Sequence, residues 1–199
     1  MSDTPVADDR HAERHADVAG WITDFDAFAE RLLEPLRGTA WLDHTMTAAT
    51  HAGEFSGIWH AIGLTRGIVT GRYDQTVALM IAIGAESLIV NQGVKRLFRR
   101  RRPTTGGDER FDIRTPLTSS FPSGHASAAA FAATILIGWD GRRSALLYVP
   151  IAAAIALSRP YVRIHHASDI VGGVATGLAL AAAARPIIQL AAPARRRRA

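Results

Sequence analysis

Near the N-terminus the apolar positions repeat with the period of a helix. Further along the chain they form long, nearly continuous runs. Residues 20–38 place apolar side chains three and four positions apart, which predicts an amphipathic helix. Charged residues such as Asp24 and Arg31 fall on its other face, so the helix suits either a membrane surface or the side of a helical bundle. Residues 1–19 have no apolar period, which predicts a disordered tail.

Five apolar stretches follow this helix. The stretch at 76–94 is the best candidate for a membrane span, because nineteen helical residues approach the thickness of the roughly 30 Å hydrocarbon core. Glu86, Asn91 and Gln92 interrupt it, so one face is expected to point into protein. The other four stretches are 55–70, 123–138, 144–158 and 169–190. The pattern predicts an all-α, integral-membrane helical bundle with about five transmembrane helices plus the N-terminal amphipathic helix.

Composition narrows the chemistry. The chain has 199 residues, which suits one domain, and no cysteine, which excludes disulfides and thiolate chemistry. Much of the net charge of +5 lies in two runs, Arg99–Arg102 and Arg195–Arg198. Basic runs suit nucleic acid, anionic lipid or the flank of a span. Beside apolar segments we prefer the membrane explanation and expect no nucleic-acid partner, although a mean hydropathy of +0.06 argues against a membrane protein.

Two clusters of polar residues lie at predicted span boundaries. One carries two positive charges, and the other lies at the predicted start of a helix. Lys95 and Arg102 are seven residues apart, so both cations point the same way if the helix continues through them. A plain basic flank is the alternative. Ser123, Gly124 and His125 precede a helix of small residues. Ser123 is expected as the N-cap, and the free N–H groups of the first turn can hold an anion. A capped helix with an incidental histidine explains the same residues.

The third cluster contains Arg159, His165 and Asp169. His165 and Asp169 are four residues apart and share one face if that segment is helical. A carboxylate bound to one imidazole nitrogen fixes the tautomer and leaves the other nitrogen nucleophilic. The planar guanidinium of Arg159 can hold phosphate oxygens. The alternative is that Asp169 is only a favourable charge at a helix N-terminus.

Together these clusters supply three cations, a helix N-terminus and two imidazoles. Phosphoryl transfer depends mostly on positioning and electrostatic stabilisation, so this set is sufficient in principle. Side-chain cations can neutralise a phosphoryl group by themselves, so neither a metal nor another cofactor is expected.

The three clusters resemble the signature of the type 2 phosphatidic acid phosphatase family, which reads K-x6-RP, PSGH and SR-x5-H-x3-D. The chain has KRLFRRRRP at 95–103, PSGH at 122–125 and SRPYVRIHHASD at 158–169. The resemblance covers roughly residues 40–190. It implies a helical catalytic domain of the phosphatidic acid phosphatase type 2/haloperoxidase-like kind over that range, with a basic C-terminal tail at 191–199.

The resemblance also implies a role for each matching residue. His165 becomes the nucleophile that forms phosphohistidine, Asp169 orients it, and His125 is the general acid for the leaving alcohol. The implied phosphate-binding residues are Lys95, Arg102, Ser123, Gly124 and Arg159. The family often has Tyr-Pro after its nucleophile, where this chain has His166 and Ala167. Spacing to Asp169 favours His165 over His166 as the nucleophile.

Family members of this size are usually membrane proteins that act on lipid phosphates or isoprenyl phosphates. We therefore expect a membrane-bound, metal-independent phosphatase of a lipid phosphate or isoprenyl (di)phosphate, with that lipid and the membrane as its partners. The extra arginines at 99–101 fit a diphosphate or an anionic headgroup, and equally a basic collar facing lipid. With five spans, the positive-inside rule puts Arg66, Arg72, Arg142 and Arg143 in the cytoplasm and the active site on the extracytoplasmic face. Oligomeric state stays open.

Other functions remain open from the sequence. Vanadate-dependent haloperoxidases resemble the same three blocks, although they are generally larger and soluble. A serine hydrolase using Ser123, His165 and Asp169 lacks the G-x-S-x-G elbow. A non-catalytic membrane module would bind anionic lipid or nucleic acid through its arginine runs. A metal site built from His125, His165 and Asp169 is also conceivable.

Overall fold

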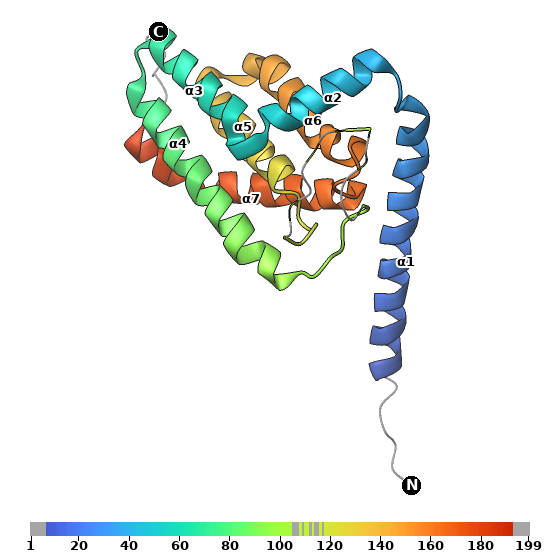
Figure 1. Ribbon diagram of the computed structural model, residues 1–199. Helices are drawn as coiled ribbons and strands as arrows, with labels where there is room; N and C mark the ends of the chain where they lie inside the picture. The colour runs from blue at the N-terminus through green and yellow to red at the C-terminus, as the bar shows by residue number, and fades with distance from the viewer. Residues whose placement is uncertain are drawn as a thin grey trace.

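The chain folds into a bundle of helices (Figure 1). The computed structural model describes residues 7–104, 108, 110–111, 113, 116 and 118–192, with side chains described from residue 17 onward. The helices are α1 (Ala7–Leu33), α2 (Ala40–Ala52), α3 (Gly57–Thr70), α4 (Tyr73–Leu88), α5 (Gly124–Asp140), α6 (Ala145–Tyr161) and α7 (Ala167–Ala191). Short turns of helix are η1 (Glu34–Leu36), η2 (Glu54–Ser56), η3 (Ile89–Gly93), η4 (Val94–Leu97) and η5 (Arg142–Ser144). The predicted all-α class is confirmed.

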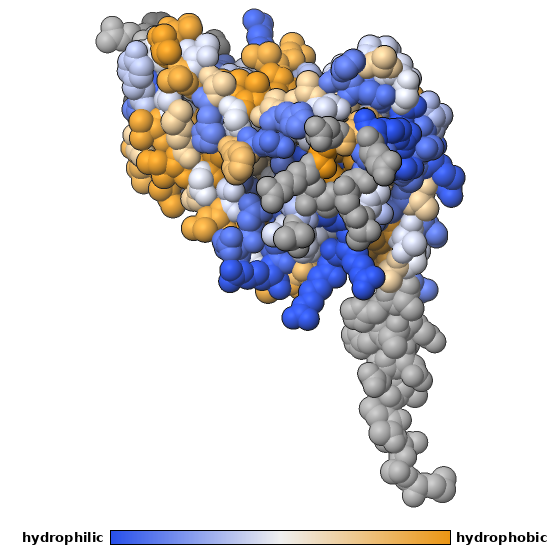
Figure 2. Space-filling model, in the orientation of Figure 1, coloured by the Kyte–Doolittle hydropathy of each residue, from blue (hydrophilic) through white to orange (hydrophobic). Residues whose placement is uncertain are grey.

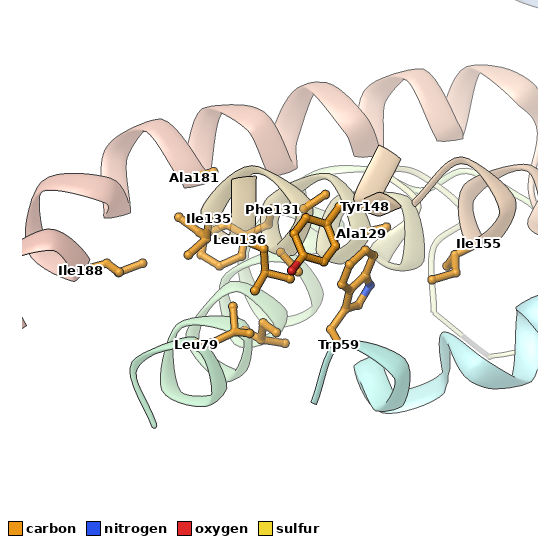
Figure 3. Packing of buried hydrophobic residues seen from close by; sticks show 13 residues of the cluster. Trp59, Leu79, Ala129, Phe131, Ile135, Leu136, Tyr148, Ile155, Ala181 and Ile188 are labelled. Carbon is orange, nitrogen blue, oxygen red and sulfur yellow. The ribbon is translucent and has the colours of Figure 1, made fainter. Parts of the chain in front are cut away.

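The central helix is α5, which packs against α7, α6 and α4. Its buried face is built largely from small residues such as Ala126, Ala129 and Ala132, which let neighbouring backbones come close. Larger side chains from the surrounding helices, including Trp59 on α3 and Leu79 on α4, converge on this face (Figure 3). The prediction of a small-residue helix here is confirmed, and this helix forms the centre of the core.

The crossing of α5 and α7 is set by two glycines. A Cβ atom on Gly177 would lie 2.2 Å from the carbonyl oxygen of Ser127, and one on Gly173 would lie 2.5 Å from that of Ser123. Side chains larger than hydrogen therefore do not fit at this crossing. The contact holds the start of α5, which carries the PSGH residues, against the first turns of α7.

Gly177→Val is expected to lower the free energy of unfolding by about 1–3 kcal/mol or more, because overpacking against backbone atoms forces the two helices apart. Thermal unfolding of the detergent-purified protein, followed by circular dichroism, measures the loss. Gly84→Ala on α4 is the matched control, since no neighbouring atom lies within 4 Å of a Cβ at that position. An unfolding midpoint for Gly177→Val equal to that of the control would contradict the packing argument.

Three segments are long and apolar enough to cross a membrane, namely Tyr73–Leu97, Arg142–Tyr161 and Ala167–Ala191. The other two predicted stretches form α3 and α5, which are 14 and 17 residues long. Exposed apolar side chains gather over α3 and α4 (Figure 2). The expected helical membrane bundle is confirmed, while the number of about five spans stays a prediction.

The N-terminal helix differs in extent from the predicted one. The sequence pattern predicts a helix at 20–38 after a disordered tail, whereas α1 begins at Ala7 and ends at Leu33. The Ala, Glu and Arg residues before position 20 are good helix formers even without an apolar period. At the other end, Pro35 lies in the short 3-10 turn η1 that follows α1. Residues 1–6 and the arginine run at 195–198 lie outside the described residues.

Candidate active site

The residues of the three predicted clusters meet at one end of the bundle, where α5 and α7 begin and α6 ends (Figure 1). A cavity of about 260 Å³ opens there. The predicted site residues that line it are Lys95, Arg102, Gly124, His125, Arg159 and His165. Segments far apart in the sequence therefore bring three cations and two imidazoles to one cavity.

His165 lies just before α7 and is 3% exposed. Its Nδ1 atom is 3.4 Å from Asp169 Oδ2 and 3.5 Å from Ser120 Oγ. Its Nε2 atom is 3.1 Å from Arg102 Nη1. Because a guanidinium group only donates hydrogen bonds, Nε2 must be the acceptor and Nδ1 carries the proton. The imidazole therefore has its lone pair on Nε2, the nitrogen that an in-line attack on phosphorus requires.

Asp169 is completely buried and each of its carboxylate oxygens has partners. Oδ2 accepts hydrogen bonds from the backbone N–H of His166 at 2.8 Å and from the hydroxyl of Ser120. Oδ1 accepts one from Arg100 at 2.6 Å. The predicted contact with His165 is present but arises differently, since α7 begins at Ala167 and His165 lies outside it. The carboxylate reaches back from the first turn, as a capping side chain does.

His125 occupies the first turn of α5, behind the predicted N-cap Ser123, whose hydroxyl accepts a hydrogen bond from the N–H of Ala126 at 3.4 Å. Among the described residues, no group forms a hydrogen bond with the buried His125 Nε2. Gly53, at the end of α2, lies against the imidazole ring, because a Cβ there would be 2.6 Å from His125 Cδ2. Ser123 serves as a cap and does not line the cavity; its role in phosphate binding stays a prediction.

The guanidinium of Arg159 brings hydrogen-bond donors to the cavity that have no partner in the described part of the chain. Arg159 is 3% exposed, and within the described part of the chain its Nε and Nη1 atoms form no hydrogen bond. Buried donors without partners are costly. Lys95 Nζ lies nearby, 3.7 Å from where a Cβ on Gly124 would be. A tetrahedral oxyanion in this space would satisfy the guanidinium and the ammonium together.

Lys95 and Arg102 reach the cavity without the continuous helix that the sequence argument assumed. The helix of α4 passes through the π turn η3 and the 3-10 turn η4 and ends at Leu97. The following residues up to Arg102 have no regular structure, and Arg102 itself, which precedes Pro103, is disfavoured in the α conformation. The expectation that one helix continues through Lys95 and Arg102 is therefore wrong, although both cations do line the cavity.

Several contributors to the site were not recognised in the sequence. Gly53 and Ser120 carry no motif, and a glycine at a helix end ordinarily indicates a cap. Arg100 belongs to the arginine run, where we expected contacts with a diphosphate or headgroup or a basic collar, but it binds the buried carboxylate of Asp169. Of the polar residues expected to point into protein, Glu86 is 3% exposed, lines the cavity and accepts a hydrogen bond from Ser127. Asn91 also lines the cavity, whereas Gln92 is exposed, so the expectation is wrong for Gln92.

The imidazole of His165 is expected to stay neutral, with its proton on Nδ1, from pH 7.5 down to pH 5. Burial lowers the pKa of His165 to about 3, with Arg102 and Arg159 adding to the effect and Asp169 opposing it. A lowered pKa means that the neutral form persists as the pH falls, until the pH approaches that value. Nitrogen NMR of labelled histidine in the phosphate-free protein, assigned by the signal missing in His165→Asn, reports the charge and tautomer. Titration near pH 6.5 would contradict the prediction.

No group of three or more metal-ligating side chains is assembled among the described residues. The carboxylate of Asp169 accepts hydrogen bonds from Ser120, His166 and Arg100.

The PAP2 superfamily matches residues 75–192 of the chain. The decaprenylphosphoryl-5-phosphoribose phosphatase of Mycolicibacterium smegmatis is 31% identical over 129 residues, which cover 63% of this chain and 68% of that protein. Phosphatidylglycerophosphatase B of Bacillus subtilis is 26% identical over 151 residues, covering 70% and 72%. The crystal structure of a transmembrane PAP2-type phosphatidylglycerolphosphate phosphatase from Bacillus subtilis aligns with a TM-score of 0.62 and 21% identity, over 88% of this chain and 96% of that one.

Proposed function

The chain belongs to the PAP2 superfamily, and on that premise we propose that it hydrolyses a lipid-linked phosphomonoester through a phosphohistidine at His165, without a metal ion. It is a phosphatase of the membrane, with homologues named for lipid phosphates. One observation carries the mechanistic proposal. In the described part of the chain, Arg159 Nε and Nη1 and His125 Nε2 have no hydrogen-bond partner, and both residues line the same cavity as His165.

The proposed reaction has two steps. In the first, His165 Nε2 attacks phosphorus, the bond from phosphorus to the alcohol oxygen breaks, and His125 gives its proton to that oxygen. In the second, His125 takes a proton from water, the water oxygen attacks phosphorus, and the bond to His165 breaks. Lys95, Arg102 and Arg159 stabilise the negative charge on the phosphoryl oxygens in both steps.

The proposed substrate has a small phosphate end and a lipid end that lies outside the cavity. A cavity of about 260 Å³ is smaller than the roughly 300–1,000 Å³ of pockets that hold drug-sized ligands. That is room for a phosphate and part of the alcohol that carries it, and too little for a lipid chain. The relatives' names specify phosphate on a lipid-linked ribose and on phosphatidylglycerol, so lipid phosphates of this kind and isoprenyl (di)phosphates are the substrates to test.

We also propose that the catalytic end faces the extracytoplasmic side. The opposite end carries Arg66 at the end of α3, Arg72 before α4, and Arg142 and Arg143 between α5 and α6. Arginine in short loops is typical of the cytoplasmic side.

Because Gly53 and other residues of the α2–α3 region contribute to the cavity, the proposed catalytic unit begins near residue 40.

Phosphate release by the purified protein in detergent tests the proposal. A panel of phosphatidic acid, phosphatidylglycerol phosphate and isoprenyl mono- and diphosphates is assayed with a chelator present, beside a heat-inactivated control. We expect release from at least one lipid, unaffected by the chelator. Activity lost to the chelator and restored by a divalent metal would contradict the metal-free mechanism. Bromide oxidation dependent on added vanadate, without phosphate release, would instead support a haloperoxidase.

A further inference from the structure

Helix α1 contacts the rest of the protein through its charged face. The carboxylate of Asp26 accepts hydrogen bonds from the backbone N–H and the hydroxyl of Ser168, both at 2.8 Å, and it pairs with Arg100. One turn further, Glu30 pairs with Arg163 at 2.7 Å. A helix on a soluble domain turns its apolar stripe toward the core instead. The polar face of α1 is therefore the inner one.

The apolar face of α1 points away from the protein. Its large side chains are exposed, with exposed fractions of 79% for Trp21, 45% for Phe25, 52% for Phe28 and 56% for Leu32. At about 100° per residue, these four positions fall within roughly 60° of one another around the helix. The exposed residue Arg31 lies about 90° from the middle of this stripe, between the apolar and inner faces. An apolar stripe of this size marks a surface that something covers.

The position of α1 indicates that lipid covers this stripe. Ser168, which Asp26 contacts, is the second residue of the candidate span Ala167–Ala191, so α1 lies at the level where that span begins. Figure 1 shows α1 running across this end of the bundle and beyond it. Tryptophan and phenylalanine on one side and charges on the others are typical of helices that lie in the membrane interface.

The inner face of α1 is connected to the catalytic carboxylate through one guanidinium. Arg100 donates to Asp169 Oδ1 at 2.6 Å through Nη1 and binds Asp26 through Nη2. The other oxygen of Asp169 receives the N–H of His166 and lies next to His165. Arg100 therefore fixes the orientation of the Asp169 carboxylate group, and Asp26 holds the guanidinium of Arg100 in place.

We propose that α1 docks its apolar face on the lipid surface and that this docking positions Asp169, through Asp26 and Arg100, for catalysis at His165. The inference rests on the proposed function, because it concerns the same nucleophile. Asp26 and Arg100 are positioning residues, since they contact Ser168 and Asp169 rather than the cavity. Turnover then depends on contact between α1 and lipid as well as on substrate binding.

A single introduced cysteine tests the docking, because the chain has none of its own. Phe28→Cys carries an environment-sensitive fluorophore in vesicles of phosphatidylcholine and phosphatidylglycerol, and Arg31→Cys is the matched control on the same helix. Nitroxide-labelled lipid is expected to quench the label at position 28 several-fold more than at position 31. Equal quenching at both positions overturns the docking. Shielding of position 28 that lipid does not quench and that grows with protein concentration indicates a second copy and also overturns it.

Kinetics in the same vesicles test the coupling. Asp26→Asn, Arg100→Gln and the double variant Phe25→Glu/Phe28→Glu are each expected to lower kcat about tenfold or more with little change in KM, because misplaced catalytic groups slow chemistry rather than binding. Asp24→Asn is expected to keep the wild-type kcat. Combining Asp26→Asn with Arg100→Gln should add little to the larger single loss, since both act through one contact.

Two outcomes contradict the coupling. A wild-type kcat in Phe25→Glu/Phe28→Glu would separate docking from catalysis. Changes confined to KM in Asp26→Asn and Arg100→Gln would assign these residues to binding. Quenching of the label on Phe28→Cys by lipid, together with no phosphate release by the wild-type protein, would contradict the proposed function and leave the docking intact.

Discussion

His165→Ala is expected to lower phosphate release by about 10⁴-fold or more, because removing the attacking group of a covalent mechanism leaves only binding and electrostatic stabilisation. The imidazole has its lone pair on Nε2, 3.1 Å from Arg102, and no other described histidine lines the cavity except His125. Single-turnover assays with radiolabelled lipid phosphate, quenched in alkali, also measure the covalent intermediate. The alkali-stable label of a phosphohistidine is expected in the wild type and absent from His165→Ala.

Two other histidines are the controls for this assignment. His44, on the exposed side of α2, is expected to tolerate alanine with wild-type turnover. His166 lines an outer cavity between α1 and the start of α7 and does not line the inner cavity with the three cations. His166→Ala should therefore still form the covalent intermediate. Covalent label in His165→Ala that disappears in His166→Ala would move the nucleophile to position 166.

His125→Asn is expected to slow hydrolysis of an alkyl phosphate by about 10³-fold, in the range of a lost general acid. The loss in the first step should be much smaller for p-nitrophenyl phosphate, because nitrophenolate leaves without a proton. The second step still lacks its base, so phosphoenzyme should accumulate after a burst of nitrophenol. Rapid-mixing absorbance and acid-labile, alkali-stable label measure these two quantities.

Gly53→Ala tests the role of His125 without replacing the imidazole. Its new Cβ would lie 2.6 Å from His125 Cδ2, so the ring must move while the imidazole itself is kept. The same dependence on leaving group, in weaker form, is expected. Equal losses of His125→Asn on alkyl and aryl phosphates, with no burst, would show that His125 does not protonate the leaving alcohol.

Much of the fold could be predicted because helix and span signals are local. The apolar stretch at 144–158 corresponds to α6 and the one at 169–190 to α7, since composition and period within each stretch determine its structure. The helix α2 was not predicted, because residues 40–52 are only weakly apolar. Its place depends on distant contacts such as the hydrogen bond from Thr50 to Ser158 at 2.8 Å.

The sequence by itself determined which chemistry this chain carries, since the spacing of Lys95 to Arg102, PSGH and His165 to Asp169 identified the candidate cations and imidazoles. Only the tertiary structure decided how they meet. The helix does not continue to Arg102, Asp169 reaches His165 from the first turn of α7, and Arg100 turns toward that carboxylate. The physical reason is that residue type and period are local properties, whereas the end at which α5, α6 and α7 converge is set by packing, above all by the close crossing at Gly177.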